Sequence, residues 1–447
     1  MKKNQVLVIA IIFISVVFFK SCSNQNTEAF VKPPFQTLNV LFLSFIINVD
    51  EVNFIELPNG GSISIPANVF VDANKKPIVG KVDLKYREFQ NVADLILSGI
   101  PMVYDSAGKK NIFESAGMFE ILGYQNNNPV YIKENTSLTI TTASDYKESN
   151  YSAYLLDTVN KNWNYLGIAE AQNNFKKDSL EAFISQIPVQ PLQPKKINSQ
   201  SKLIDLDVNY SRFSELKHFH GLMWEYAEDD AKANFDETIY KENWADIKIA
   251  RCEGQDNFII TLKNSKREVD IKVAPILTGK SYDKAMEKYQ DAFANFENEL
   301  VKKEKAASLA VAQKQFLRTM EVNQFGIYNW DRIFKQEDLL AIDADFKFNE
   351  KTVFDPKEVL IYLMVSDKNA IVQYDASSWN KFSFSPDENN KLIAILPDDK
   401  IAVFSSKEFK KLNIDKLYGT PKHTFELVIK PSKILSSQHL FDELKNI

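Results

Sequence analysis

Apolar and polar residues alternate along most of the chain between residues 37 and 170. The stretches SISIPANVF and GKVDLKYREF place apolar residues at every second position, which is typical of a strand with one buried face. Clusters of Asn, Gly, Asp and Pro separate these short strand patterns, for example PNGG from residue 58 and QNNNP from residue 125. The pattern therefore predicts an N-terminal antiparallel β-sandwich over residues 37–170.

The stretch LNVLFLSFII, residues 38–47, is the most apolar part of the chain after residue 21. It is too short to cross a bilayer core, which takes about 20 residues. We therefore predict a buried core strand here.

Residues 171–200 interrupt the strand pattern. The run IPVQPLQPKK contains three prolines within seven residues, which favours an extended connector. We predict a Pro-rich linker over 171–200, with a domain boundary inside it.

The segment 201–320 mixes strand patterns with the clearest helical pattern of the chain. From Ser281 to Met320 the sequence predicts a long amphipathic helix, because one set of apolar residues recurs at intervals of three and four. We expect this helix to pack across its own domain, and an arm that contacts a partner is the alternative. The apolar set is Tyr282, Met286, Tyr289, Phe293, Phe296 and Leu300.

The last segment, 321–447, returns to strand patterns such as EVLIYLMV, LIAILP and TFELVIK. It predicts a C-terminal β-rich domain. The expected fold class is thus mainly β with some α: an N-terminal antiparallel β-sandwich, a mixed central segment with one long helix, and a C-terminal β-rich domain.

The N-terminus has the composition of a secretory signal. Two lysines precede an uncharged apolar run, Val6–Phe19, which is short for a membrane span. Ser21 and Cys22 follow, and the arrangement resembles a bacterial lipoprotein signal, in which cleavage precedes a cysteine that then carries diacylglycerol and a further acyl chain such as palmitate. We predict a signal peptide over 1–21, lipidation of Cys22 and a tether over 22–36. Lys20 departs from the usual small or apolar residue, so an uncleaved anchor is the alternative.

Composition narrows the classes of partner. The chain has 447 residues and a formal net charge of −5, without a basic stripe that would neutralise phosphates, so we expect no nucleic-acid partner. Cys22 and Cys252 are its two cysteines. If Cys22 is acylated, Cys252 has no partner in the chain, and we interpret it as a small buried hydrophobic residue at a strand end.

One stretch has the outline of a phosphate-binding loop. In APILTGKSYDKAM a strand pattern leads through Gly279-Lys280-Ser281 into the predicted helix. The motif requires a glycine where Ala274 stands, and Pro275 removes a backbone donor. We therefore interpret Ser281 as a helix N-cap and expect no nucleotide.

The remaining candidates for chemistry lack their partners. His218 and His220 could hold a metal with Glu215 or Glu225, but the sequence has no HExxH motif. Ser115 lacks the first glycine of G-x-S-x-G, and Cys252 lacks a flanking nucleophile signature. We predict no catalytic residue, no metal site and no cofactor. Two acidic stretches, Asp72 with Asn74 and Asp343 with Asp345, lack calcium-loop spacing and are interpreted as turn and surface residues.

Residues 55–121 resemble a region of uncharacterised Bacteroidota envelope lipoproteins. The shared features are an IPAN-F strand, SGIPM-YDS-G and ESAGMFEI, and FGIYNWDR at 325–332 resembles a later segment of the same proteins. The resemblance implies an exported β-rich lipoprotein without an assigned activity. We expect it on the periplasmic face of the outer membrane.

Two functions follow as hypotheses. The first is a non-enzymatic envelope lipoprotein, held to the membrane by its lipid, that scaffolds or binds another envelope protein; the second is a glycan-binding lipoprotein of an uptake system. A hydrolase ranks third. An exposed apolar patch would favour the first and a cluster of exposed aromatic rings the second. The candidate rings for the second are Trp163, Trp224, Trp244, Trp330 and Trp379.

Overall fold

The computed structural model places the chain in two compact units. Unit 1 comprises Met1–Lys177 and Ala312–Ile447, and unit 2 comprises Asp178–Val311. Unit 2 is therefore an insertion in the sequence of unit 1, and its start lies inside the predicted linker. The structure describes residues 30–106, 108–168, 170–197, 202–204, 213, 216, 219, 222–227, 236–252, 255–335, 338–349, 354–365 and 368–447.

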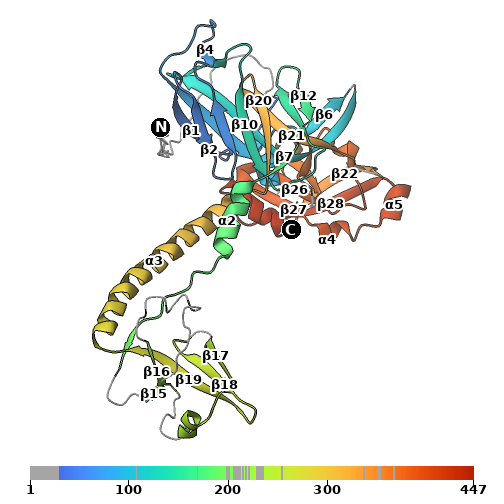
Figure 1. Ribbon diagram of the computed structural model, residues 1–447. Coiled ribbons are helices and arrows are strands. Elements are labelled where there is room, and N and C mark those ends of the chain that lie inside the picture. Colours follow the sequence, from blue (N-terminus) through green and yellow to red (C-terminus); the bar gives the residue numbers. More distant parts are fainter. Residues whose placement is uncertain are drawn as a thin grey trace. The chain divides into compact units, whose positions relative to one another are not determined.

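Strands dominate the fold. They make up 42% of the chain against 23% for helices, which confirms the prediction of a mainly β protein with some α. Figure 1 shows the strands gathered into sheets and one long helix, α3. In the described part of the chain, no helix combines the length and the apolarity that a membrane crossing requires.

Two antiparallel sheets enclose the N-terminal core of unit 1. One has the order β13-β20-β10-β3-β2, and the other contains β1, β5, β7, β21 and β11. In the SISI strand, Ile63 and Ile65 are buried in the core between the sheets, while both serines stay partly exposed. The alternation of apolar and polar residues therefore determines which face of the strand packs against the core. The bounds are β1 (Leu43–Asn48), β2 (Asn53–Glu56), β3 (Ser62–Ile65), β5 (Lys81–Phe89), β7 (Lys109–Gln125), β10 (Leu138–Ser144), β11 (Ser152–Asp157), β13 (Gln172–Asn173), β20 (Phe316–Val322) and β21 (Gly326–Phe334); the short strands are β4 (Phe70–Val71), β6 (Val103–Ser106), β8 (Asn128–Pro129) and β9 (Tyr131–Ile132).

The N-terminal and C-terminal strands share one sheet. Its order is β12-β11-β21-β7-β24-β23-β26-β27-β28-β22-β25, and β24 joins β7 where Ala370 lies opposite Glu114. The structure thus differs from the two separate domains predicted at 37–170 and 321–447, because strand pairing joins residues that are distant in the chain. The further strands are β12 (Asn162–Ile168), β22 (Leu340–Phe348), β23 (Leu360–Val365), β24 (Ala370–Tyr374), β25 (Phe382–Phe384), β26 (Asn390–Leu396), β27 (Lys400–Phe404) and β28 (Lys422–Ile429).

Aromatic rings fill the C-terminal core of unit 1. Phe425 on β28 contacts the rings of Phe346, Phe382 and Phe404, with centroid distances of 5.5, 5.3 and 5.3 Å. Most of these pairs meet at steep angles, the edge-to-face arrangement that aromatic quadrupoles favour. The short helices α4 (Ser406–Phe409) and α5 (Ile414–Gly419) close this core through Phe409 and Leu417.

Two helices pack in a further core of unit 1, together with residues of β7, β21 and the central strands. Asn91 caps helix α1 (Val92–Ser98), because its side chain accepts hydrogen bonds from the first backbone N–H groups. Asp94 of α1 accepts a hydrogen bond from Ser437 of α6 (Ser437–Lys445), and burial raises the pKa of this carboxyl. The pair α1 and α6 is thus joined by a polar contact inside an apolar core.

The segment 30–40, which we call the strap, lies against this core. Phe35 is buried there, and the backbone N–H of Gln36 donates to Asp399 at 2.8 Å. The predicted tether over 22–36 is therefore wrong for residues 30–36, which pack on the fold. Residues 22–29 lie outside the described part of the chain.

The apolar segment 38–47 is not a buried core strand. β1 begins only at Leu43, and Ile46 keeps 64% of its surface exposed. Among the described strands, β1 pairs with β5 alone and lies at an edge, so its outer face meets solvent. Hydrophobicity alone predicted burial here, whereas the position of the strand in the sheet decides it.

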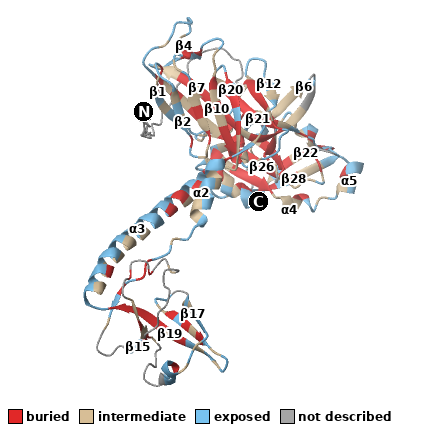
Figure 2. Cartoon of the chain, viewed as in Figure 1, coloured by how far each residue is buried: buried red, intermediate tan, exposed pale blue. Residues whose placement is uncertain are grey.

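Unit 2 contains a small sheet with its own core. Its order is β15-β16-β19-β18-β17, with β14 alongside β19, and Trp224 and Phe258 lie at the centre of the core with ring centroids 5.4 Å apart. Figure 2 shows the buried positions concentrated along β19. The strands are β14 (Lys195–Lys196), β15 (Leu203–Ile204), β16 (Met223–Tyr226), β17 (Asp246–Arg251), β18 (Phe258–Lys263) and β19 (Glu268–Leu277).

Helix α3 (Gly279–Ala312) confirms the predicted long helix, although it ends before Met320 because β20 starts at Phe316. Its aromatic residues from Tyr282 to Phe296 are half-buried rather than buried. The fully buried positions are Ala285, Lys303, Ala306 and Ala310. The ammonium group of Lys303 lies over the ring of Phe183 in α2 (Phe175–Ser185), 4.4 Å from its centroid.

Buried amides hold together the two points of unit 1 between which unit 2 is inserted. The Asn174 side chain donates to the side-chain oxygen of Gln313 at 3.2 Å, and Gln313 donates to the carbonyl of Pro58 at 2.9 Å. The PNGG turn closes over both, since a Cβ on Gly60 would meet each amide at 2.5 Å. The insertion therefore begins and ends at adjacent, hydrogen-bonded positions.

Candidate functional site

Several predicted site residues lie outside the described part of the chain. These are Cys22, Glu215 and the histidines His218 and His220, which stand two positions apart. Among the residues that the structure describes, no group of three or more His, Cys, Asp or Glu side chains could hold a metal ion.

The outline of a phosphate loop resolves into a simple strand-to-helix turn. α3 begins at Gly279, which has a left-handed φ of 43°, and not at a Ser281 cap. Ser281 lies in the first turn and donates its backbone N–H to Thr278 at 3.0 Å. Cys252 follows the end of β17, as expected, and is a free thiol, but it is half-buried rather than buried.

The tryptophans are turned inward. Trp163, Trp224 and Trp330 are buried, and Trp244 and Trp379 are half-buried. Asp72 accepts the backbone N–H groups of Asn74 and Lys76, which is the expected turn role.

The two segments that carry the lipoprotein resemblance meet in space. ESAGMFEI lies on β7 and FGIYNWDR on β21, and these strands pair antiparallel. Opposite Asp331 stands Ser115, and opposite Trp330 stands Gly117, so Ala116 is an extra residue in β7. This bulge uses the left-handed φ of 135° at Gly117. We call the polar residues around it, Glu114, Ser115, Asn329, Asp331 and Arg332, the junction cluster.

One side of the junction cluster is a buried ion pair. The guanidinium of Arg332 donates to both carboxylate oxygens of Glu114, at 2.9 Å from Nε and 2.8 Å from Nη2. The Tyr151 hydroxyl also donates to Glu114, at 3.2 Å. These bonds raise the pKa of the Arg332 guanidinium, and burial next to Glu114 raises the pKa of Tyr151. The bidentate geometry fixes the register of β7 on β21.

A second arginine extends this side of the cluster. Arg318 is buried on β20 and donates to Ser144 at 2.9 Å and to the carbonyl of Glu148 at 2.8 Å. Both Arg318 and Arg332 lie over the Tyr151 ring, each 5.0 Å from its centroid. Burial lowers the pKa of Arg318. The network thus connects the two sheets of the N-terminal core.

The other side of the junction cluster holds the buried carboxyl group of Asp331, which has no hydrogen-bond partner. The Ser115 hydroxyl donates to the Asn329 side-chain oxygen at 2.7 Å and accepts the backbone N–H of Gly117 at 3.0 Å. Asp331 is fully buried beside them, and neither of its carboxyl oxygens has a hydrogen-bond partner. Burial raises the pKa of Asp331 well above its ordinary value, and the nearby Ser115 and Asn329 offset this only in part.

Asn369, in the turn that leads into β24, anchors the junction cluster to the C-terminal part of unit 1. The backbone N–H of Ser115 donates to the Asn369 carbonyl at 3.0 Å, and the Asn369 side chain donates back to the Ser115 carbonyl at 3.1 Å. This exchange stands next to the β7–β24 ladder pair of Glu114 and Ala370. The cluster therefore lies where the N-terminal and C-terminal strands join.

The junction cluster suits a structural role. Ser115, Asn329 and Asp331 have no exposed surface, so a substrate could not reach them without local opening. Sequence reasoning considered Ser115 only as a nucleophile and missed Glu114, Asp331 and Arg332. The signal available was weak: two short segments of one resemblance, the first beginning with Glu114 and the second ending with Asp331 and Arg332.

Replacing Asp331 with asparagine tests this assignment through pH. The folded chain holds the Asp331 proton to a higher pH than the unfolded chain does, so its contribution to stability is present below the unfolded value near 3.8 and is lost as pH rises through the folded pKa. We expect Asp331→Asn to remove this loss and to be at least as stable as wild type at pH 8. Urea unfolding between pH 4 and 8 measures it, and parallel stability profiles of the two proteins would contradict it.

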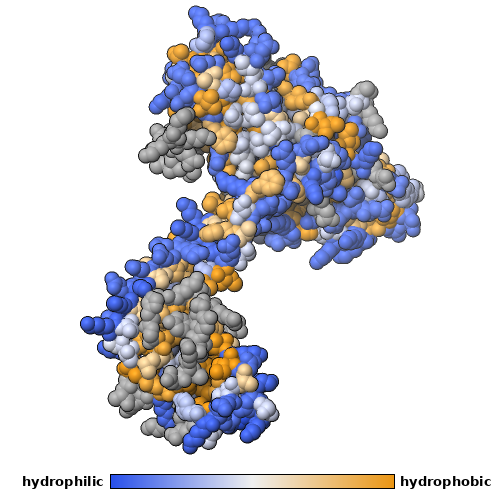
Figure 3. All heavy atoms as spheres, viewed as in Figure 1, coloured by the Kyte–Doolittle hydropathy of each residue, from blue (hydrophilic) through white to orange (hydrophobic). Residues whose placement is uncertain are grey.

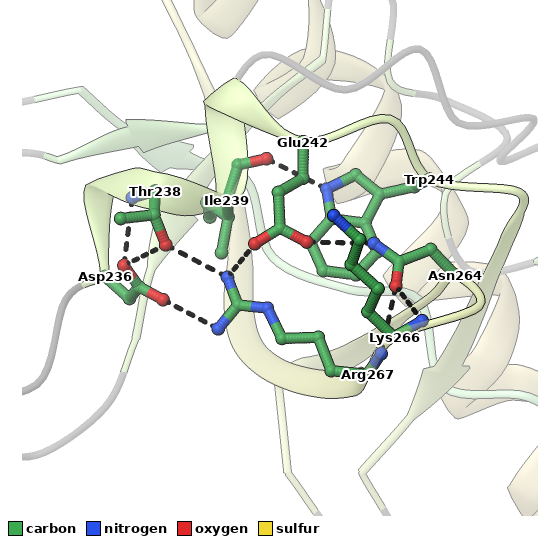
Figure 4. A network of polar contacts seen from close by, with 8 residues as sticks. All are labelled: Asp236, Thr238, Ile239, Glu242, Trp244, Asn264, Lys266 and Arg267. Atoms are coloured by element: carbon green, nitrogen blue, oxygen red, sulfur yellow. Dashed lines mark hydrogen bonds and ion pairs between the residues drawn. The ribbon is translucent and has the colours of Figure 1, made fainter.

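Unit 2 has a separate surface network, shown in Figure 4. Arg267 donates to Asp236 at 3.0 Å and contacts Glu242 at 2.7 Å, and Asn264 donates to the other Glu242 oxygen at 2.8 Å. The Trp244 ring lies 5.6 Å from the guanidinium. Hydrogen bonds lower the pKa of both acids. The network joins the turn after Asp236 to the β18–β19 hairpin. We therefore interpret it as a structural contact that stabilises the packing of these two segments.

Comparison of this chain with protein-family models, with curated proteins and with solved structures found no match.

Proposed function

We propose that this protein is a non-enzymatic lipoprotein of the cell envelope, anchored through Cys22, that binds or scaffolds another envelope protein. One observation carries the binding part: helix α3 exposes apolar side chains along its second half. Val301 keeps 64% of its surface exposed, and three further apolar side chains in this half of the helix are exposed as well: Leu300, Leu309 and Val311.

Exposed apolar side chains on a helix are costly to leave in water, and a protein partner can cover them. Figure 3 shows hydrophobic side chains in several places on the visible surface. The glycan-binding alternative has less support, because none of the five tryptophans is exposed. The exposed tyrosines in the described part of the chain, Tyr131, Tyr165, Tyr240 and Tyr418, belong to different elements. The hydrolase alternative has no observation in its favour.

The anchor is tested by labelling cells with a fatty acid. We expect the label on the wild-type protein, its complete loss in Cys22→Ala, and release of that variant from the membrane fraction, because the lipid chains supply the membrane affinity. A Cys252→Ala variant is the matched control and should keep the label. Equal labelling of the Cys22→Ala variant, or no label on any form, would overturn the anchor.

The same cells test the partner by in-cell crosslinking. The variant Val301→Glu places a charge on the exposed face of α3, and Val159→Glu places one on an exposed turn of unit 1. We expect the crosslink to one envelope protein to disappear in Val301→Glu and to remain in Val159→Glu. A crosslink pattern that is the same in all forms would contradict binding through α3.

A further inference from the structure

One sheet edge of unit 1 lacks the features that normally prevent a further strand from pairing with it. Proteins protect edge strands with charged residues, with proline, with a bulge or with short length. β1 has none of these, because it runs for six residues in unbroken register with β5, and residues 38–49 contain no charged residue and no proline. Among the described strands, β5 is its one partner, so one side of the β1 backbone has no strand beside it.

The other edge strands in the described part of the chain are protected. β17 carries three charged residues, Asp246, Lys248 and Arg251. β12 has a bulge in its pairing with β11, where Gly167 takes a left-handed φ of 147°. The edge strands β2, β13, β15 and β25 have four residues or fewer. β1 is therefore the edge that remains open to strand addition.

The N-terminal core is incompletely closed on the side where β1 lies. β1 and β2 are consecutive strands at the edges of the two sheets, and Figure 1 shows them on the same side of unit 1. Phe45 of β1 and Ile55 of β2 pack on the core but are only half-buried. Ile46, Val52 and Phe54 keep 64%, 71% and 62% of their surfaces exposed. This side thus combines apolar surface with an open strand edge.

A second copy of the chain fits this edge by its symmetry. A two-fold axis perpendicular to the sheet pairs two β1 strands antiparallel and continues both faces of the sheet from one copy into the other. With the axis at Ile46, this residue lies opposite Ile46 of the second copy on the outer face, and Phe45 lies opposite Ile47 of the second copy on the core face. The open side of each copy then covers the open side of the other.

The distribution of charge supports the antiparallel orientation. The acids nearest to β1 in the sequence, Asp50 and Glu51, directly follow its end and are exposed. With the axis at Ile46, the two copies of Asp50 stand about 27 Å apart along the strands, well beyond the Debye length of about 8 Å. Parallel pairing in register would instead place the acids of the two copies side by side. Antiparallel pairing therefore brings no like charges opposite each other.

We propose that two copies of this chain associate through β1, antiparallel and with Ile46 opposite Ile46 of the second copy. The pairing supplies hydrogen-bond partners to the open backbone edge and places one aliphatic side chain against another. It goes beyond the proposed function, because it depends neither on a lipid at Cys22 nor on the surface of α3.

Disulfide trapping tests the pairing and its register. The full chain with Cys22→Ala and Cys252→Ala, purified in detergent, has no thiol of its own. Opposite residues of an antiparallel pair have Cβ atoms about 4.5–5.5 Å apart, so Ile46→Cys in this background should form a disulfide-linked dimer under mild oxidation. Val159→Cys, in an exposed turn, is the matched control and should give at most about a tenth of that dimer. Equal dimer from the two variants, or none from Ile46→Cys, would overturn the proposed register.

Sedimentation of the wild-type chain in detergent measures the association itself. We expect a dimer whose fraction rises with concentration. Ile46→Lys places two ammonium groups opposite each other and should weaken the dimer about tenfold, whereas Ile168→Lys, the same change on the bulged strand β12, should leave it unchanged.

Two outcomes of the sedimentation experiment would overturn the proposal. One is a wild-type chain that stays monomeric at every concentration, and the other is a dimer that Ile46→Lys does not weaken. If the chain is a monomer and Ile46→Lys removes an in-cell crosslink to another envelope protein, the β1 edge belongs to that protein and not to a second copy.

Discussion

Replacing Glu114 with alanine is expected to lower the free energy of unfolding by about 3 kcal/mol. The substitution leaves the half-buried Arg332 guanidinium without the carboxylate to which it makes two hydrogen bonds. It also removes the acceptor for the Tyr151 hydroxyl. The expected loss of stability lies at the lower end of the range for breaking a buried ion pair, because Arg332 keeps 20% of its side-chain surface exposed. Urea unfolding of the purified protein, followed by circular dichroism, measures it.

Two variants serve as controls for this prediction. Glu114→Gln keeps the shape and one acceptor for Tyr151, so it should lose less stability than the alanine variant. Glu134→Ala breaks an ion pair with Lys75 in which both side chains are 77% exposed, and it should leave the unfolding curve unchanged. If Glu114→Ala unfolds like wild type, the ion pair does not stabilise the junction cluster.

Replacing Gly99 with alanine is expected to displace the strap from the fold. A Cβ at this position would stand 2.0 Å from the Lys32 carbonyl oxygen and 2.6 Å from the Pro33 nitrogen, both backbone atoms that cannot rotate away. Gly99 also has a left-handed φ of 62° at the end of α1. We expect a loss of at least about 2 kcal/mol of stability and new proteolytic cleavage within residues 30–40.

Gly80→Ala separates the two causes. Gly80 has a similar left-handed φ of 82°, but a Cβ there would meet no atom within 4 Å. This variant carries the backbone strain without the steric clash, so we expect only about 1 kcal/mol and no cleavage of the strap. Equal effects of the two substitutions, with the strap protected in both, would show that close packing against Lys32 and Pro33 does not hold the strap.

The local patterns predicted local structure well. Alternation in SISI and KVDLKYREF identified strands and their buried faces, because a strand turns every second side chain to the same side. The spacing of apolar residues after Ser281 identified α3 for the same kind of reason. Both are short-range properties, which a window of several residues contains.

The candidate site could not be predicted in this way. Glu114 and Arg332 are 218 positions apart, and unit 2 lies between them in the sequence. Their partnership depends on the pairing of β7 with β21, and the unpaired state of Asp331 depends on the bulge beside it. No pattern within either segment specifies which strand will lie opposite.

The sequence by itself determined the fold class, the existence of the strands and of the long helix, and the composition of the N-terminal segment from which the proposed anchor at Cys22 is inferred. The tertiary structure alone decided that the N-terminal and C-terminal strands form one sheet, that the strap is packed, and that the apolar strand near Ile46 lies exposed at an edge. The physical reason is that periodicity sets which face of an element is apolar, whereas burial depends on which other element covers that face.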